Sequence, residues 1–214
     1  MKRISNHNMP KLFLGLFFCS LCTVFAIHSN LGLSPWGVFH QGIARKVGIS
    51  FGLTSIIISL MIVLVVSFLG LRVGIGTIYN MLFIGIMVDA LDYFHLIPDA
   101  ASMGQGIMML ILSMMFNAIG SYLYISCELG CGPRDGLMSV LTRITHLPVG
   151  VIRCAIEGTV FLTGWSLGGT VGIGTVINVF GISVFIDLFY KMMDFQISKV
   201  HHHTIWESIR FMKG

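Results

Sequence analysis

The sequence predicts an all-α membrane protein with six transmembrane helices, arranged as two inverted three-helix repeats that each contain a re-entrant half-helix. Three observations support this class: a duplicated glycine-rich motif, a strongly apolar composition, and segments long enough to cross a bilayer. In each half, a short segment that opens with proline completes the pattern.

The duplication is clearest at two identical glycine-rich turns, Val73-Gly-Ile-Gly-Thr77 and Val171-Gly-Ile-Gly-Thr175, which lie 98 positions apart. The same offset, applied without a gap, matches further residues along both halves. These pairs include Leu31-Gly32 with Leu129-Gly130, Pro35 with Pro133, Arg45 with Arg143, Gly52 with Gly150, Asn80 with Asn178 and Asp89 with Asp187. A repeat of this kind constrains the fold more than any single motif.

Apolar residues make up 55% of the chain and charged residues 10%, whereas soluble domains hold about 25% charged residues. Six segments approach the roughly 20 apolar residues that a crossing helix needs: 12–29, 51–70, 74–95, 106–127, 149–168 and 172–192. The first also resembles a signal peptide. We expect a span there, because no small-x-small cleavage site follows and its counterpart 106–127 is internal.

Basic residues set the predicted orientation, because cytoplasmic loops keep an excess of Lys and Arg. We expect a bacterial plasma-membrane protein with both termini in the cytoplasm. In this orientation only Arg45 and Lys46 lie on the outer side. An odd number of spans per repeat then inverts the second copy relative to the first. The predicted parts are a cytoplasmic N-terminus (1–11), a first repeat (12–96), an external linker (97–105), a second repeat (106–192) and a cytoplasmic tail (193–214).

Two segments, Leu31–Lys46 and Leu129–Ile144, are too long for turns and too short to cross. Pro35 and Pro133 suit the first position of a helix, because proline lacks the N–H that would be unsatisfied there. We expect re-entrant half-helices whose N-termini meet near the bilayer midplane and favour an anion or a polar oxygen. Amphipathic helices lying on the two membrane surfaces are the alternative.

The motifs Gly32-Leu-Ser-Pro-Trp36 and Gly132-Pro-Arg-Asp-Gly136, with the two glycine-rich turns, resemble those of the YczE/YyaS-type bacterial integral membrane proteins, which are related to the YitT group. The resemblance covers about residues 12–192. It implies a plasma-membrane protein, with some members linked to secondary-metabolite production, and supplies no catalytic residue. An acidic residue usually follows the tryptophan in that family, where this chain has Gly37.

The predicted binding site lies where the two half-helices meet. Its expected members are polar, aromatic or proline residues of the two half-helices and of the third and sixth spans: Ser34, Pro35, Trp36, His40, Pro133, Arg134, Asp135, Asn80 and Asn178. Arg134 is expected at the positive end of a helix dipole, where its own charge is unfavourable. We therefore expect an anion near it, either a ligand or a structural partner such as Asp135 or Glu157. The Asn residues and His40 have structural alternatives in helix packing and hydrogen bonding.

Glu157 lies near the centre of the fifth predicted span, one helical turn after Arg153. Ionisable residues at that depth are hypotheses for function, so proton coupling is one interpretation and an internal ion pair is the other. For Asp187 we expect an ion pair with Lys191 at the surface. Cys19 and Cys22 are interpreted as small buried residues, with redox or metal use as the alternative, and His201-His202-His203 as surface decoration rather than a metal site.

These features predict a secondary transporter or channel for a small polar or anionic solute. The alternative is a membrane accessory protein that supports an enzyme or synthase complex and moves nothing, and a membrane thiol enzyme ranks third. We expect no enzymatic activity, cofactor, metal or nucleic acid, since no Walker loop, dinucleotide fingerprint, zinc cluster or nucleophile elbow occurs. The expected partners are the lipid bilayer and the solute, with a homo-oligomer left open.

Overall fold

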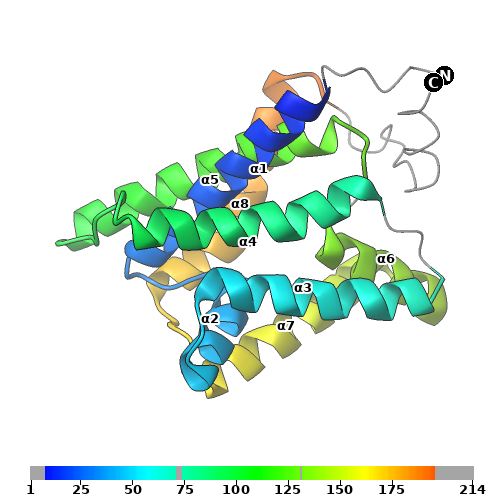
Figure 1. The fold of residues 1–214 in the computed structure, drawn as a ribbon, viewed down its shortest axis with the longest axis horizontal. Coiled ribbons are helices and arrows are strands. Elements are labelled where there is room, and N and C mark those ends of the chain that lie inside the picture. The colour runs from blue at the N-terminus through cyan, green and yellow to red at the C-terminus, as the bar shows by residue number, and fades with distance from the viewer. Residues whose placement is uncertain (1–7, 71–73, 131, 196–214) are drawn as a thin grey trace.

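A computed structural model describes residues 8–70, 74–130 and 132–195, and all regular secondary structure in these ranges is α-helical (Figure 1). The predicted all-α class is therefore confirmed. The residues Val73 and Cys131 and the histidine-rich tail lie outside the described ranges. The helices are α1 (Asn8–His28), α2 (Pro35–Val47), α3 (Phe51–Phe68), α4 (Ile75–Tyr93), α5 (Met103–Ile125), α6 (Pro133–Thr145), α7 (Val149–Ser166) and α8 (Ile173–Met192).

Five of these helices, α1, α3, α4, α5 and α8, are long and apolar enough to cross a membrane. The chain is thus a helical protein with several membrane-spanning segments. The helix α7, at the predicted span 149–168, is not among the five, since Arg153 and Glu157 reduce its hydropathy. A sixth crossing remains a prediction.

The two short helices begin where the proline motifs predict. Pro35 opens α2 after the N-cap Ser34, whose hydroxyl accepts a hydrogen bond from Gly37 N, and Pro133 opens α6 after Gly132. Each helix holds 13 residues, about 20 Å at 1.5 Å per residue. In Figure 1, α2 lies at the left end of the long helices and α6 at the right end.

Helix boundaries and contacts recur with the offset of the sequence motif. The helices α3 and α7 both hold 18 residues and begin 98 positions apart, as α2 and α6 do. The contacts are also reciprocal, because α2 packs on α7 while α6 packs on α3, and α1 packs on α4 while α5 packs on α8. Each half therefore places its short helix against a long helix of the other half.

The repeated glycine turns join the halves through matching hydrogen bonds. Gly76 N donates to Leu129 O at 2.8 Å, and Gly174 N donates to Leu31 O, also at 2.8 Å. A Cβ atom at Gly174 would lie 2.8 Å from that same Leu31 oxygen, so only glycine allows this approach. The two identical turns thus serve backbone contact between the halves.

At the centre, α1 crosses α5 with backbones close together. A Cβ atom at Gly15 would lie 2.8 Å from Tyr124 N, and one at Gly120 would lie 2.7 Å from Cys19 Sγ. Small residues permit such close approach between membrane helices. The wholly buried Leu12 and Leu16 pack beside this crossing.

Replacement of Gly174 by Ala is expected to lower the free energy of unfolding by about 1–3 kcal/mol, because the added methyl group overpacks the contact with Leu31. The matched control is Gly158→Ala, since nothing lies within 4 Å of a Cβ atom there. Thermal melting of the two detergent-solubilised variants checks this. Equal melting temperatures would contradict the packing role of the turn.

Candidate functional site

The first turns of α2 and α6 meet inside the molecule. The guanidinium carbon of Arg134 lies 4.8 Å from the centroid of the Trp36 ring, a distance typical of a cation–π contact. Trp36 and Arg134 occupy the same position in their respective short helices, directly after Pro35 and Pro133. The first residues of the two short helices are therefore in contact, and their re-entry to the bilayer midplane stays a prediction.

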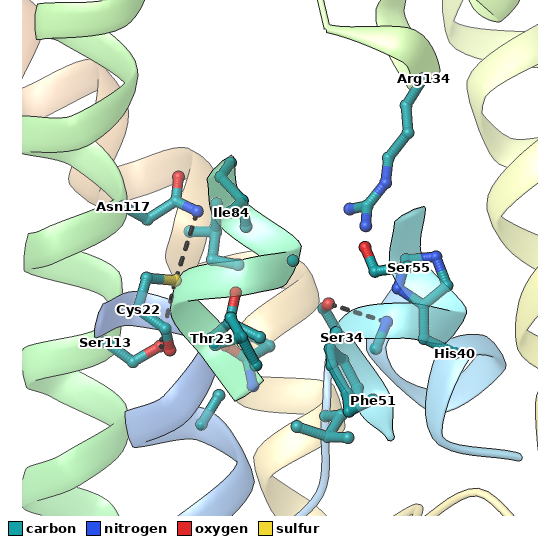
Figure 2. Close-up of a pocket in the computed structure, with 18 residues that line it drawn as sticks. Cys22, Thr23, Ser34, His40, Phe51, Ser55, Ile84, Ser113, Asn117 and Arg134 are labelled. Carbon is teal, nitrogen blue, oxygen red and sulfur yellow. Dashed lines mark hydrogen bonds between the residues drawn. The ribbon is translucent and has the colours of Figure 1, made fainter. Parts of the chain in front are cut away.

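Beside this contact lies a cavity of about 110 Å³, large enough for a few water-sized molecules (Figure 2). Of the predicted site residues, Ser34, His40, Arg134 and Asn178 line it. Cys22, which the sequence predicts to be a small buried residue, also lines it. Side chains from α1, α3 and α5 that were not predicted complete its polar wall: Thr23, Ser55, Ser113 and Asn117.

Arg134 supplies the positive charge of the cavity. Figure 2 shows its side chain extending from α6 toward Ser55 and His40. The carboxylates of Asp135 and Glu157 act on its charge. Asp135 is adjacent to it in the first turn of α6 but does not line the cavity. The guanidinium is therefore stacked on an aromatic ring at the cavity, with the negative charges of Asp135 and Glu157 near enough to act on it.

His40 is almost completely enclosed in the wall, with 1% of its surface exposed. Neither of its ring nitrogens has a hydrogen-bond partner, and its ring lies among Trp36, Phe39 and Phe51. A buried polar atom without a partner costs free energy and calls for an explanation. Because His40 lines the cavity, a ligand there could supply that partner.

Asn178 shares this property. It is 2% exposed, it lines the cavity from α8, and its side-chain Nδ2 has no partner. Its repeat equivalent Asn80 is only half-buried and does not line the cavity. The neighbouring Thr175 accepts a hydrogen bond from Gly172 N at 3.3 Å and so serves the helix start. One copy of the repeated Thr/Asn pair thus contributes to the cavity and the other does not.

The remaining predicted site residues lie near the cavity or apart from it. Pro35, Trp36 and Pro133 shape the two helix starts behind its wall. Arg153 and Glu157 do not line the cavity and bind each other, with Arg153 Nε 3.0 Å from Glu157 Oε1. That pair is partly exposed on α7.

Cys22 belongs to a small polar network at the wall formed by α1 and α5. Asn117 Nδ2 donates to Cys22 Sγ at 3.4 Å, Ser113 Oγ lies 3.4 Å from the same sulfur, and Ser113 Oγ donates to Cys22 O at 2.8 Å. In the described part of the chain, no group of three or more His, Cys, Asp or Glu side chains could hold a metal ion. The wall therefore offers mainly hydroxyl, thiol and amide groups.

The fold and the cavity define a multi-pass helical membrane protein, and comparisons place it in a family. A family model described as "Family of unknown function (DUF6198)" matches residues 7–191, and the chain belongs to this family. It is 37% identical over 165 residues to an uncharacterized protein of Haemophilus influenzae, covering 77% of this chain and 75% of that one. It is 32% identical over 168 residues to the uncharacterized membrane protein YczE of Bacillus subtilis, covering 78% and 77%.

The resemblance to YczE-type proteins is thereby confirmed. No solved structure matches the chain.

Replacement of His40 by Phe is expected to raise the free energy of unfolding by about 1–2 kcal/mol, because it removes two buried polar atoms that have no partner. The matched control is His28→Phe. His28 Nδ1 lies 2.9 Å from Asp99 Oδ1 and Nε2 lies 3.1 Å from Asp92 Oδ1, so its loss is expected to destabilise. Melting temperatures in detergent, without added solute, check both. A His40→Phe protein that melts below the parent would contradict the unsatisfied state of this histidine.

Proposed function

We propose that the protein is a secondary transporter or channel that moves a small polar or anionic solute across the bacterial plasma membrane without converting it. The solute binds at the cavity between the starts of α2 and α6. The observation that carries the proposal is the unpartnered His40, which lines the same cavity as the guanidinium of Arg134.

The proposed architecture is a pair of inverted three-helix repeats, with α7 as the sixth crossing and with α2 and α6 re-entering from opposite sides. It is supported by the reciprocal bonds of Gly76 and Gly174, by the exchanged short helices, and by the opposite chain directions of α3 and α7 in Figure 1. Transporters built in this way bind their substrates near the midplane at broken helices. The excess of basic residues favours cytoplasmic termini.

The chemistry of the cavity favours an acceptor-rich solute of few non-hydrogen atoms. Arg134 and Asn178 offer N–H donors, and Ser34 and Ser55 offer hydroxyl groups. Backbone N–H groups at two helix starts add a positive potential that favours anions. The cavity, of about 110 Å³, is large enough for a small carboxylate or an inorganic oxyanion.

Flux into proteoliposomes tests the proposal with a panel of small carboxylates, inorganic anions and neutral polar solutes. For a transported anion, Arg134→Ala is expected to lower the flux at least about tenfold, because a buried charge-assisted contact contributes roughly 1.5–3 kcal/mol. Arg134→Lys should retain part of the flux, since it keeps the charge but not the planar donor fork.

The matched control is Lys46→Ala, which removes an exposed cation at the end of α2, far along that helix from the cavity. Its flux should equal that of the parent. Full flux in Arg134→Ala would disprove the site. No flux across the panel, together with co-purification of a stoichiometric partner, would favour the accessory role.

A further inference from the structure

The two halves differ most at the contact between α3 and α4 and its repeat equivalent between α7 and α8. The helix α3 packs along α4, whereas α7 and α8 share no comparable interface. Gly52 on α3 lies directly against the Gly85 carbonyl and the Asp89 carboxylate of α4. Its equivalent on α7, Gly150, has nothing within 4 Å of a Cβ atom. One of two equivalent contacts is therefore closed and the other is open.

Asp89 holds the closed contact. Its carboxylate accepts hydrogen bonds from Gly52 N at 2.7 Å, from Leu53 N at 3.1 Å and from the hydroxyl of Ser50. A carboxylate suits this place because the first N–H groups of a helix lack partners and the helix dipole is positive there. Asp89 thus fastens α4 to the start of α3.

Asp187 is the repeat equivalent of Asp89, and it is free of such contacts. It is exposed on α8, and among the described residues it forms no ion pair, so the expected bridge to Lys191 is absent. The start of α7, where its carboxylate would bind by analogy, has no side-chain cap. The carboxylate of Asp187 and the uncapped start of α7 are therefore the repeat equivalents of the two groups that bind each other where Asp89 caps α3.

We infer that the structure is one of two alternating states. The contact of Asp89 with the start of α3, here called the Asp89 latch, is closed in it. The equivalent contact of Asp187 with the start of α7, the Asp187 latch, is open. In the second state α7 closes on α8, Asp187 caps the N–H groups of Gly150 and Val151, and α3 separates from α4. The helices α3 and α7 begin at opposite ends of the molecule, so the two latches would open the cavity to opposite sides in turn (Figure 1). Because such alternation serves transport, this inference rests on the proposed function.

The second state would also change the environment of Glu157. Its repeat equivalent on α3 is Ser59, which is 8% exposed in the closed contact. Closure of α7 on α8 would bury the Glu157–Arg153 pair in the same way. The pair would then lie beside the cavity, because Ser55, the repeat equivalent of Arg153, lines it. The pair is then neutral overall as it enters the low-dielectric interior, which lowers the cost of burial.

A natural cysteine makes the inference testable. Ile56 of α3 packs over Gly85 of α4 in the closed contact, and the repeat equivalents of these two residues are Cys154 and Ser183. A Ser183→Cys variant, with the other four cysteines replaced by Ala, reports closure of α7 on α8 as a disulfide with Cys154. Free thiols are counted with a maleimide–polyethylene glycol reagent after oxidation, in protein reconstituted in lipid.

With Asp89 and Asp187 both unchanged, we expect little disulfide between Cys154 and the cysteine introduced in Ser183→Cys. Asp89→Asn releases the closed latch and is expected to raise disulfide formation roughly tenfold, the shift expected when charge-assisted hydrogen bonds are lost from one state only. Adding Asp187→Asn to Asp89→Asn should cancel the gain. No gain in Asp89→Asn, or an equal gain with both aspartates replaced, would overturn the two-latch inference.

A second cysteine pair guards against a folding defect. Ile56→Cys with Gly85→Cys reports the closed latch, so it should oxidise readily in the parent background and less in Asp89→Asn. A chain that switches between the two disulfides but moves no solute would overturn the transport proposal alone. A chain that carries solute while neither pair responds to the aspartate substitutions would overturn the latches alone.

Discussion

A helix that begins in the interior of a membrane protein must find partners for its first N–H groups, because lipid offers none. This protein places two such beginnings against each other. The start of α2 has the hydroxyl of Ser34 as its cap, whereas α6 begins after Gly132 without a side-chain cap. Between them lie a stacked guanidinium, Arg134 on Trp36, and a polar cavity. The arrangement of the long helices follows from this meeting point, because each short helix is packed on a long helix of the opposite half.

The near symmetry of the two halves makes their differences informative. The bonds of Gly76 and Gly174 match in partners and length, so the cross-half connections are symmetrical. The aspartates at repeated positions are not in matching environments, because Asp89 caps α3 while Asp187 is exposed. A duplicated chain that uses one copy of a contact and leaves the other unused has two equivalent arrangements available, and alternating access requires such a pair.

Much of this structure is predictable from the sequence, because its main signals are local. Pro35 and Pro133 mark the starts of the short helices, and the repeated glycine turns mark the starts of α4 and α8. The offset between the copies also pairs Trp36 with Arg134, which places the two at the same meeting point. These inferences need only helix geometry and the repeat.

Other parts of the site depend on packing that sequence patterns do not specify. Cys22, Ser113 and Asn117 face the cavity because of how α1 crosses α5, and an apolar helix has no polar face that would indicate this. Asn80 and Asn178 occupy repeated positions with the same residue, yet only Asn178 lines the cavity. The capping of α3 by Asp89 joins residues that are far apart in the chain, so it is a tertiary contact without a local signature.

The central claim is that two helix starts meet within the membrane around a space open to water and attractive to anions. Accessibility of a cysteine at Ser34 tests it most directly, in otherwise cysteine-free protein in lipid vesicles. A small, membrane-impermeant sulfonate thiol reagent should modify a Ser34→Cys variant several-fold faster than a cationic reagent of equal size, and Arg134→Ala should remove that preference. No modification by either charged reagent, alongside rapid modification by a lipid-soluble one, would contradict the account.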